Sequence, residues 1–458
     1  MTAVDAAHGT AQALAQGARF IALFVETGST GAQSVTYVLD EARKLSRRTG
    51  TLTAAALPSL KVPAAGWAER EARDRFGLRF DRDVGARLIP PLDAEALLAS
   101  ASPEVSSVLY GPIRSGIVES AQWVVQTVGE DFVHVAPSMF YKRRGVEERF
   151  VGCTLDDGAF VAEFCSGATA LSHACAYARA VETATGSEVP LRARAARSML
   201  VEFERIHQHL DALAKLAEDG SLLVGSMQLF AAKERVHRLL AESTGSRFGR
   251  GVVKPGGLRA DAFASLAEVC VRLLDEVEAQ TRSVVEALFA SQSLLDRLIG
   301  TGRLTPKNVV AFGGVGPVAR GSGVRCDARA IDGALFTSLT GDEVLEEGTD
   351  AAARALVRRT EIRDSFRLIR NALDAAPSGA WCADVPDVDG CGIARVESPQ
   401  GELVYAVRVL GGRLPCVRLR SASYANWPLF QTTLPGNIFT DFSFIDHSFG
   451  LLQAEVDR

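Results

Sequence analysis

The sequence lacks the paired cysteines from which iron–sulfur and zinc sites are usually built. Its eight cysteines are scattered along 458 residues, and no two of them are spaced as C-x-x-C. Because that spacing is the usual one for cluster and zinc ligands within one chain, we expect this chain to hold neither kind of site through its cysteines. Free, buried thiols in a reducing cytosol are the simpler interpretation.

Long apolar runs and an excess of basic residues are also lacking. The longest apolar run near the N-terminus is FIALFV, from Phe20 to Val25, which is far shorter than the ~20 residues needed to span a bilayer. The first residues have neither a basic n-region nor a long apolar segment, so they do not indicate a secretory signal. A net charge of -5 gives no basic footprint for nucleic acid. We therefore expect a cytoplasmic protein that reaches a membrane only through partners.

What the chain does have is length and apolar content. With 458 residues, 47% of them hydrophobic, it can form roughly two to three domains of ordinary size with well-filled cores. Apolar residues recur every three or four positions along four long segments, which predicts a bundle of helices. These segments are Ser187 to Ala217, Gly225 to Gly245, Ala262 to Leu298 and Ala352 to Leu373.

Short strands are expected elsewhere in the chain. Apolar clusters or alternation predict them at Arg19 to Val25, Ser34 to Leu39, Leu52 to Leu60, Gln122 to Val128 and Phe132 to Val135. Glu41 to Arg48 is interpreted as the end of a helix. A hairpin is predicted from Glu402 to Arg420, because Gly411-Gly412 separates two alternating runs. The expected fold class is α+β: a small α+β module followed by a mostly helical domain with small peripheral sheets.

Two features that could suggest a ligand have simpler interpretations. The glycine-rich stretch from Gly313 to Arg329 lacks the GK[ST] ending of a phosphate-binding loop. His207 and His209 are two positions apart and face different sides of their predicted helix, so they make a poor metal pair. We expect each of these two histidines to form hydrogen bonds within the core.

The N-terminal third contains a short and specific string. A helix from Trp67 with Gly77 as its C-cap is predicted within GWAEREARDRFGLRF, which runs from Gly66 to Phe80. The string W-x-E-R-E-x-x-D-x-F-G-x-x-F resembles the signature of the C-type subunit of respiratory complex I, a docking module. This resemblance implies a docking module over residues 1–85, followed by a linker over 86–107 and a second domain over 108–458.

The second domain is organised around the stretch from Tyr141 to Glu182. It opens with R-G-V-E at Arg144 to Glu147 and continues through Gly167, His173, Ala180 and Glu182. This pattern resembles the first metal-binding segment of the large subunits of nickel–iron hydrogenases, and the matching segment of the quinone-side, D-type subunit of complex I. The resemblance covers nearly the whole chain from about Trp67.

The thiolate positions of the hydrogenase pattern are not occupied by cysteine. Counting back from His173 puts Ser166 and Thr169 at the first two positions. At the C-terminus, Asp446 and His447 align with D-P of the D-P-C-x-x-C motif, which puts Ser448 and Leu451 at the other two. Nickel–iron centres depend on thiolates, so the resemblance implies no hydrogen activation. The D-type subunit of complex I has lost the same cysteines, and its former metal pocket is part of a quinone chamber.

The resemblance implies a cleft lined by residues that would serve catalysis or binding. The candidates for catalysis are Arg114, Tyr141, His173, Asp446 and His447, and those for holding a ligand are Arg144, Glu147, Ser166, Thr169 and Ser448. Arg114 replaces the histidine that the D-type subunit points at the quinone, so Tyr141 or His447 would have to supply the proton. Glu147 is expected to pair with Arg144.

The function that the resemblance implies is that of a fused C/D-type core subunit. Such a subunit passes electrons from the clusters of a small iron–sulfur subunit to a quinone, in an NAD(P)H- or formate-linked complex with membrane-arm subunits, on the inner face of the membrane. NAD and quinone binding are therefore among the expected properties of the complex, and no cofactor is expected in this chain. A non-catalytic scaffold is the first alternative. A changed metal site is the second, and it would be built from His173, Asp446, His447, Glu147 and Cys165.

Overall fold

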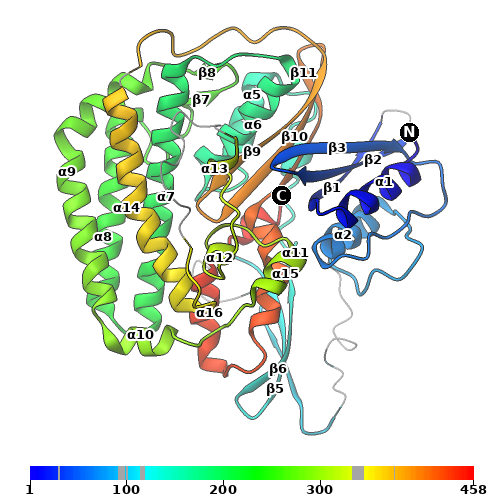
Figure 1. The fold of residues 1–458 in the computed structure, drawn as a ribbon, viewed down its shortest axis with the longest axis horizontal. Coiled ribbons are helices and arrows are strands. Elements are labelled where there is room, and N and C mark those ends of the chain that lie inside the picture. Colours follow the sequence, from blue (N-terminus) through cyan, green and yellow to red (C-terminus); the bar gives the residue numbers. More distant parts are fainter. Residues whose placement is uncertain (29–30, 91–97, 99–101, 114–118, 333–344, 376) are drawn as a thin grey trace.

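The fold is α+β, as predicted, and is described from a computed structural model (Figure 1). The structure describes residues 1–28, 31–90, 98, 102–113, 119–332, 345–375 and 377–458. A helical bundle forms one side of the molecule, small antiparallel sheets lie in the middle and below, and the N-terminal residues form the other side. Within the described residues, no helix is both long and apolar enough to cross a membrane.

The predicted bundle of long helices is confirmed. Its members are α7 (Leu191–Asp219), α8 (Leu223–Thr244), α9 (Ala262–Phe289) and α14 (Ala351–Ala375), which pack side by side (Figure 1). The first begins later than predicted because Pro190, which is its N-cap, disfavours the helical conformation in the residue before it. The third ends at Phe289, with Ala290 as its C-cap, and α10 (Gln292–Leu298) follows as a separate helix.

A second layer brings α6 (Ala170–Thr185) against a three-stranded antiparallel sheet. The strands are β9 (Gly390–Ser398), β10 (Gly401–Leu410) and β11 (Arg413–Arg420), in the order β11-β10-β9. The predicted hairpin and its Gly411-Gly412 turn are confirmed. Almost every residue of α6 is buried, because the bundle covers one side of this helix and the sheet covers the other. The turn that begins α6 is thereby held in the middle of the molecule.

The contact between α6 and β9 requires a strand without side chains at two positions. A Cβ placed on Gly392 would overlap the carbonyl oxygen of Ala180, and one on Gly390 would overlap that of Ala184. We expect Gly392→Ala to lower the free energy of unfolding by about 1–3 kcal/mol, the usual cost of overpacking. Gly66→Ala is the control, since nothing lies within 4 Å of a Cβ there. Urea unfolding of both variants tests this, and equal midpoints would contradict it.

The N-terminal residues form a sheet with helices on it. The elements are α1 (Ala3–Ala15), β1 (Arg19–Thr27), β2 (Gln33–Glu41), β3 (Lys44–Thr51) and α2 (Gly66–Phe76). The helix end predicted at Glu41 to Arg48 is wrong: Ala42 and Arg43, both with positive φ, turn the chain so that β3 pairs with β2. The strand predicted from Leu52 to Leu60 is also wrong, because only Leu57 makes a bridge, to Phe80.

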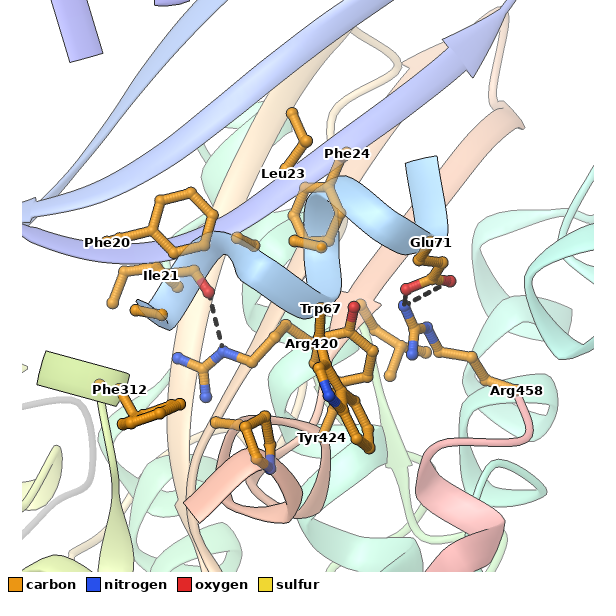
Figure 2. Close-up of a pocket in the computed structure, with 17 residues that line it drawn as sticks. Phe20, Ile21, Leu23, Phe24, Trp67, Glu71, Phe312, Arg420, Tyr424 and Arg458 are labelled. Atoms are coloured by element: carbon orange, nitrogen blue, oxygen red, sulfur yellow. Dashed lines mark hydrogen bonds and ion pairs between the residues drawn. The ribbon is translucent and has the colours of Figure 1, made fainter. Parts of the chain in front are cut away.

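The predicted helix before Gly77 is confirmed, with Gly77 as a left-handed C-cap. This helix, α2, packs on the rest of the chain at a junction drawn in Figure 2. Trp67 meets Tyr424 edge to face at 5.7 Å, and the Arg458 guanidinium lies over the same Tyr424 ring while its Nη2 donates to Glu71 at 3.0 Å. Apolar residues of β1 line the other side. The division into residues 1–85, 86–107 and 108–458 stays a prediction.

A third sheet lies below the α6 layer, next to the C-terminal helices (Figure 1). It is formed by β4 (Ser106–Tyr110), β5 (Gln122–Val128) and β6 (Asp131–Ser138), in that order. Trp123 joins it to α15 (Ala422–Thr433) and α16 (Phe442–Phe449) through contacts with Trp427, Phe430 and Phe442. The shorter elements are α4 (Val146–Arg149), α5 (Leu155–Glu163), β7 (Val253–Lys254), β8 (Gly257–Leu258), α11 (Pro306–Phe312), α12 (Gly316–Arg320) and α13 (Arg329–Asp332).

Candidate functional site

A cavity of about 430 Å³ lies where the bundle, the turn before α6 and the C-terminal segment meet. We call it the central cavity. Gly167 and Ala168 form one wall and Asp446 and His447 another, so two of the predicted segments do converge. The other lining residues are Glu119, Gln208, Asp211, Ala212, Lys215, Lys233, His237, Phe248, Arg250, Arg358, Gln400 and Gly450 to Gln453. A cavity of this size with several convergent polar groups can hold a small organic molecule.

His447 is the best-placed proton donor on the cavity wall. Its Nδ1 lies 2.6 Å from the Asp219 carboxylate at the end of α7. Burial alone would lower the pKa of His447, but the hydrogen bond to Asp219 and the nearby Asp446 outweigh that effect and raise it. The imidazole therefore stays protonated to a higher pH than usual and can act as a general acid.

The turn from Ser166 to His173 has its polar side chains behind the cavity wall. Ser166, Thr169 and His173 are buried. Thr169 Oγ1 donates to the Glu455 carboxylate at 2.7 Å, and His173 Nδ1 lies 2.8 Å from Tyr405 Oη. His173 Nε2 faces Glu455 at 3.5 Å. Thr169 and His173 thus belong to a buried polar cluster, and neither they nor Ser166 are among the residues that line the cavity.

The C-terminal residue that meets this turn is Glu455. Ser448 lies elsewhere, where its Oγ accepts from Arg354 Nε at 3.0 Å and donates to the carbonyl of Ile445 at 2.8 Å. Sequence reasoning missed both Glu455 and Tyr405, which approach His173 from segments more than 200 positions away in the chain. No periodicity or spacing in the sequence carries a signal for such contacts.

The pKa of His173 makes the contribution of this cluster to stability depend on pH, which allows a test. Burial opposes its protonation, but Cys165 and Glu455 outweigh burial and raise its pKa from 6.5 to about 10. The stabilisation by the charged ring is thus fully present below pH 6.5 and is lost as the pH rises towards 10. We expect the unfolding free energy of the wild type, relative to His173→Gln, to fall across that window in urea titrations. Exposed His8→Gln is the control, and a pH-independent difference would contradict the cluster.

The predicted pair between Arg144 and Glu147 is wrong. Arg144 donates instead to backbone carbonyls, those of Phe164 at 3.0 Å and Ala454 at 2.5 Å, and also to that of Cys165. A guanidinium with its fork of donors can join several chain segments in this way. Arg144 therefore ties the turn before α6 to the C-terminal segment, which positions the cavity wall.

Glu147 lies outside the central cavity, under the junction with α2. Its carboxylate pairs with Arg458 at 3.2 Å and Arg75 at 3.1 Å, and accepts from the backbone of Leu419 at 3.2 Å. Burial would raise the pKa of Glu147, but Arg458, Arg418 and Arg75 lower it to about 2. The role of this residue is to hold the N-terminal residues against the C-terminus.

Tyr141, another predicted residue, is not among the described residues that line the cavity. Tyr141 Oη donates to Gln122 Oε1 at 2.5 Å and is held against β5. Arg114 lies outside the described residues, so its position relative to the cavity stays untested.

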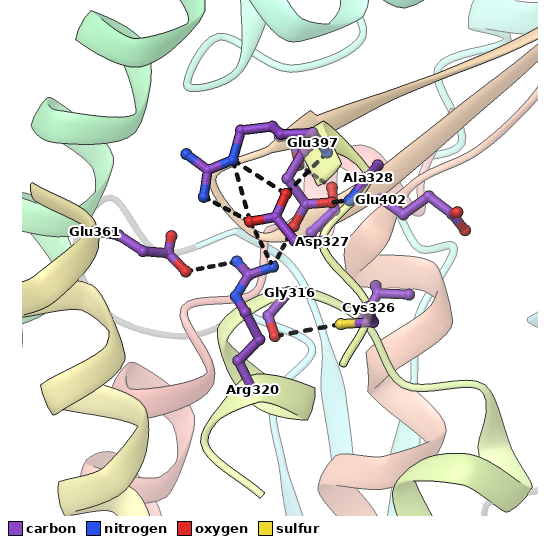
Figure 3. Close-up of polar contacts among 12 residues, drawn as sticks. Gly316, Arg320, Cys326, Asp327, Ala328, Glu361, Glu397 and Glu402 are labelled. Carbon is purple, nitrogen blue, oxygen red and sulfur yellow. Dashed lines mark hydrogen bonds and ion pairs between the residues drawn. The ribbon is translucent and has the colours of Figure 1, made fainter. Parts of the chain in front are cut away.

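A buried network of charges lies between α12, α14 and β9 (Figure 3). Arg320, fully buried, pairs with Glu361 at 2.6 Å, Glu397 at 2.7 Å and Asp327 at 3.6 Å. His209 Nε2 joins the network through Glu361 at 2.8 Å, which confirms a core hydrogen bond for this histidine. The glycine-rich stretch from Gly313 to Arg329 thus supplies buried ion pairs.

The five residues proposed for a changed metal site do not come together. Glu147 is under the junction, Asp446 and His447 line the cavity, and His173 and Cys165 lie behind it. Among the described residues, no group of three or more His, Cys, Asp or Glu side chains is placed to hold a metal ion.

Comparison with known proteins finds relatives among subunits of hydrogenases and of NADH dehydrogenases. The family described as "Respiratory-chain NADH dehydrogenase, 49 Kd subunit" matches residues 220–392. The membrane-bound hydrogenase subunit alpha of Pyrococcus furiosus is 32% identical over 356 residues, 72% of this chain and 82% of the relative. Formate hydrogenlyase subunit 5 of Escherichia coli is 28% identical over 435 residues, which cover 87% of this chain and 76% of the relative. The NADH-quinone oxidoreductase D subunit of Geobacter metallireducens is 25% identical over 389 residues, which cover 78% of this chain and 100% of the relative.

Proposed function

This chain belongs to the family of the membrane-bound hydrogenase large subunits and the 49 Kd subunit of respiratory NADH dehydrogenase, and on that premise we propose that it reduces a quinone in the central cavity. It would act as the core subunit of a membrane-associated oxidoreductase. The observation that carries the proposal is the His447–Asp219 pair on the wall of a cavity large enough for a quinone ring.

The side chains at the hydrogenase metal position do not suit a nickel–iron centre. Ser166 and Thr169 offer hydroxyls, and Thr169 already donates to the Glu455 carboxylate. Oxygen ligands of this kind suit hard cations, whereas nickel–iron centres need thiolates. Cys165 supplies one thiol beside His173. Hydrogen activation therefore forms no part of the proposal.

The reaction is a two-electron, two-proton reduction. A quinone accepts two electrons from an iron–sulfur cluster of a small partner subunit, and each of its two carbonyl oxygens becomes a hydroxyl. His447 donates one proton from its ring nitrogen, and Asp219 stabilises the imidazolium before transfer. Solvent that enters the open cavity supplies the second proton and reprotonates His447.

The partners follow from the same proposal. Relatives are named as subunits of formate hydrogenlyase, membrane-bound hydrogenase and NADH-quinone oxidoreductase. We propose an iron–sulfur subunit and membrane-arm subunits as neighbours on the inner face of the membrane. NAD(P)H or formate would be oxidised elsewhere in the complex. Residues 1–85 would be a docking module, residues 86–107 a linker and residues 108–458 the quinone-reducing domain.

The test is to purify the chain together with its partner subunits and to measure nickel, iron and quinone reductase activity on one sample. The proposal expects iron from the partner's clusters, quinone reduction and no stoichiometric nickel. A complex with intact clusters and no quinone reduction would contradict it and favour a scaffold. Stoichiometric nickel would contradict the interpretation of Ser166 and Thr169.

A further inference from the structure

Two buried arginines on α14 differ from the other buried arginines of this protein. Arg354 and Arg358 lie one helical turn apart and are 0% and 1% exposed. Buried guanidinium groups are normally paired with carboxylates. Such pairs are present at Arg197, Arg320 and Arg329. Among the described residues, no carboxylate forms an ion pair with Arg354 or Arg358.

The two guanidinium groups are held by neutral acceptors alone. Arg358 donates to His209 Nδ1 at 3.1 Å and to the carbonyls of Ser448 and Phe449 at 3.2 and 2.7 Å. Arg354 donates to Ser448 Oγ at 3.0 Å. One nitrogen of each has no hydrogen-bond partner: Nε of Arg358 and Nη2 of Arg354. Burial lowers the pKa of Arg358 to about 10 although Glu361 and Asp211 oppose the shift, so its surroundings compensate the positive charge only in part.

Arg358 and a second incompletely bonded side chain meet at the central cavity. Both Arg358 and Gln400 line it, Gln400 is 3% exposed, and its Oε1 has no partner. Rotating the Gln400 amide by half a turn exchanges its oxygen and nitrogen, and the NH₂ group then faces a ligand in place of the oxygen. Gly450 allows the arginine to lie against the backbone, because a Cβ there would come within 2.7 Å of Arg358 Nη2.

The rim of the cavity carries another cation with a free donor. Arg250 lies over the rings of Phe164 and Phe248, 5.2 and 5.6 Å from their centres, and its Nε has no partner. Stacking of this kind orients a guanidinium and leaves its edge for hydrogen bonds. The lysines of the cavity, by contrast, are already bound to a carboxylate, since Lys215 and Lys233 both contact Asp211.

We propose that the floor of the central cavity is a binding site for a small carboxylate or oxyanion, held by Arg358 and Gln400 beneath the Arg250 rim. The anion accepts hydrogen bonds from the unpartnered Arg358 Nε and from the turned Gln400 amide, and it compensates the charge shared by Arg354 and Arg358. Carboxylates on the wall, Glu119, Asp211 and Asp446, disfavour multivalent anions, so the site takes a monoanion.

The anion can come from two sources: a free small molecule, or an acidic oxygen on the molecule that is reduced in the cavity. The proposal requires no electron transfer. A failed quinone reductase assay would leave it intact, and failed anion binding would leave the proposed reduction of a neutral quinone intact.

The experiment is isothermal titration of the full purified chain in chloride-free buffer, with acetate and with the anion of 2-hydroxy-1,4-naphthoquinone as separate probes. Gln400→Leu removes one donor and is expected to weaken binding about tenfold or more, the usual effect of a hydrogen bond to a charged group. Arg358→Met is expected to weaken it further. Gln280→Leu is the matched control, because its Oε1 is also buried without a partner but lies on α9 and does not line the cavity.

Either probe that binds the wild type and the Gln280→Leu variant, and loses affinity in Gln400→Leu, supports the site. If acetate binds with this pattern, the source of the anion is a free small molecule. If only the naphthoquinone anion does so, the source is the molecule that is reduced in the cavity. Affinity that is equal in the two glutamine variants, or no binding of either probe, would overturn the proposal. The glutamine pair decides the question even if Arg358→Met fails to fold, which circular dichroism would reveal.

Discussion

Arg320→Met is expected to cost about 3–5 kcal/mol of unfolding free energy, the range measured when one partner of a buried ion pair is removed. Arg320 is fully buried and lies between the carboxylates of Glu361, Glu397 and Asp327 (Figure 3). Methionine is apolar, so these carboxylates would lose their shared cation in a medium that cannot solvate them. Urea unfolding measures the loss, and Arg325→Met, at an exposed position of the same stretch, is the control.

The pH dependence of the Arg320→Met loss separates this mechanism from a simple packing defect. Burial already raises the pKa of Glu397 to about 7, although Arg320 opposes this. Without Arg320 the carboxylates would take up protons more readily when folded than when unfolded, so acid would favour the folded variant. We therefore expect the stability deficit to be largest above pH 7 and to shrink as the pH falls. A deficit like that of Arg325→Met would contradict this account of the network.

His447→Gln is expected to lower quinone reductase activity of the assembled complex by about 10²- to 10⁴-fold, the usual contribution of a general acid. Glutamine can still donate a hydrogen bond to Asp219, so the cavity wall should keep its shape. His237→Gln is the matched control, because His237 lines the same cavity and burial lowers its pKa, which keeps it neutral and unsuited to donate.

Two further measurements make the His447 prediction specific. Wild-type activity should fall as the pH rises through the pKa of His447, which the hydrogen bond to Asp219 and the nearby Asp446 raise despite burial. The His447→Gln variant should lose that dependence. If it retains wild-type activity, or if His237→Gln is equally inactive, the proton donor has been assigned to the wrong residue.

Elements with strong local signals could be predicted from the sequence. The apolar spacing along α7 and the glycine pair at Gly411-Gly412 both led to the observed structures, because periodicity and turn chemistry are local. Glu41 to Arg48 failed for a local reason too. The turn there uses Ala42 and Arg43 at positive φ, a conformation that residues other than glycine, asparagine and aspartate seldom adopt.

The candidate site was predictable only in part. Resemblance to a known family located Ser166 to His173 and Asp446 to His447, and the segments on which they lie do meet. It did not indicate that Glu455 faces Thr169, or that Glu147 pairs with Arg458, 311 positions away. A carboxylate takes the cation that the fold brings nearest, and a neighbour in sequence such as Arg144 has no advantage when its donors are already bound elsewhere.

Quinone binding in the central cavity is the step on which the proposed reaction depends. Photolabelling of the assembled complex with an azido-quinone, followed by peptide mapping of this chain, tests that step most directly. Label is expected in peptides that contain Gly167 and Ala168 or Gly450 to Gln453, with protection by excess unmodified quinone. Label confined to the junction around Trp67 and Tyr424, or label that excess quinone does not displace, would contradict quinone binding in this cavity.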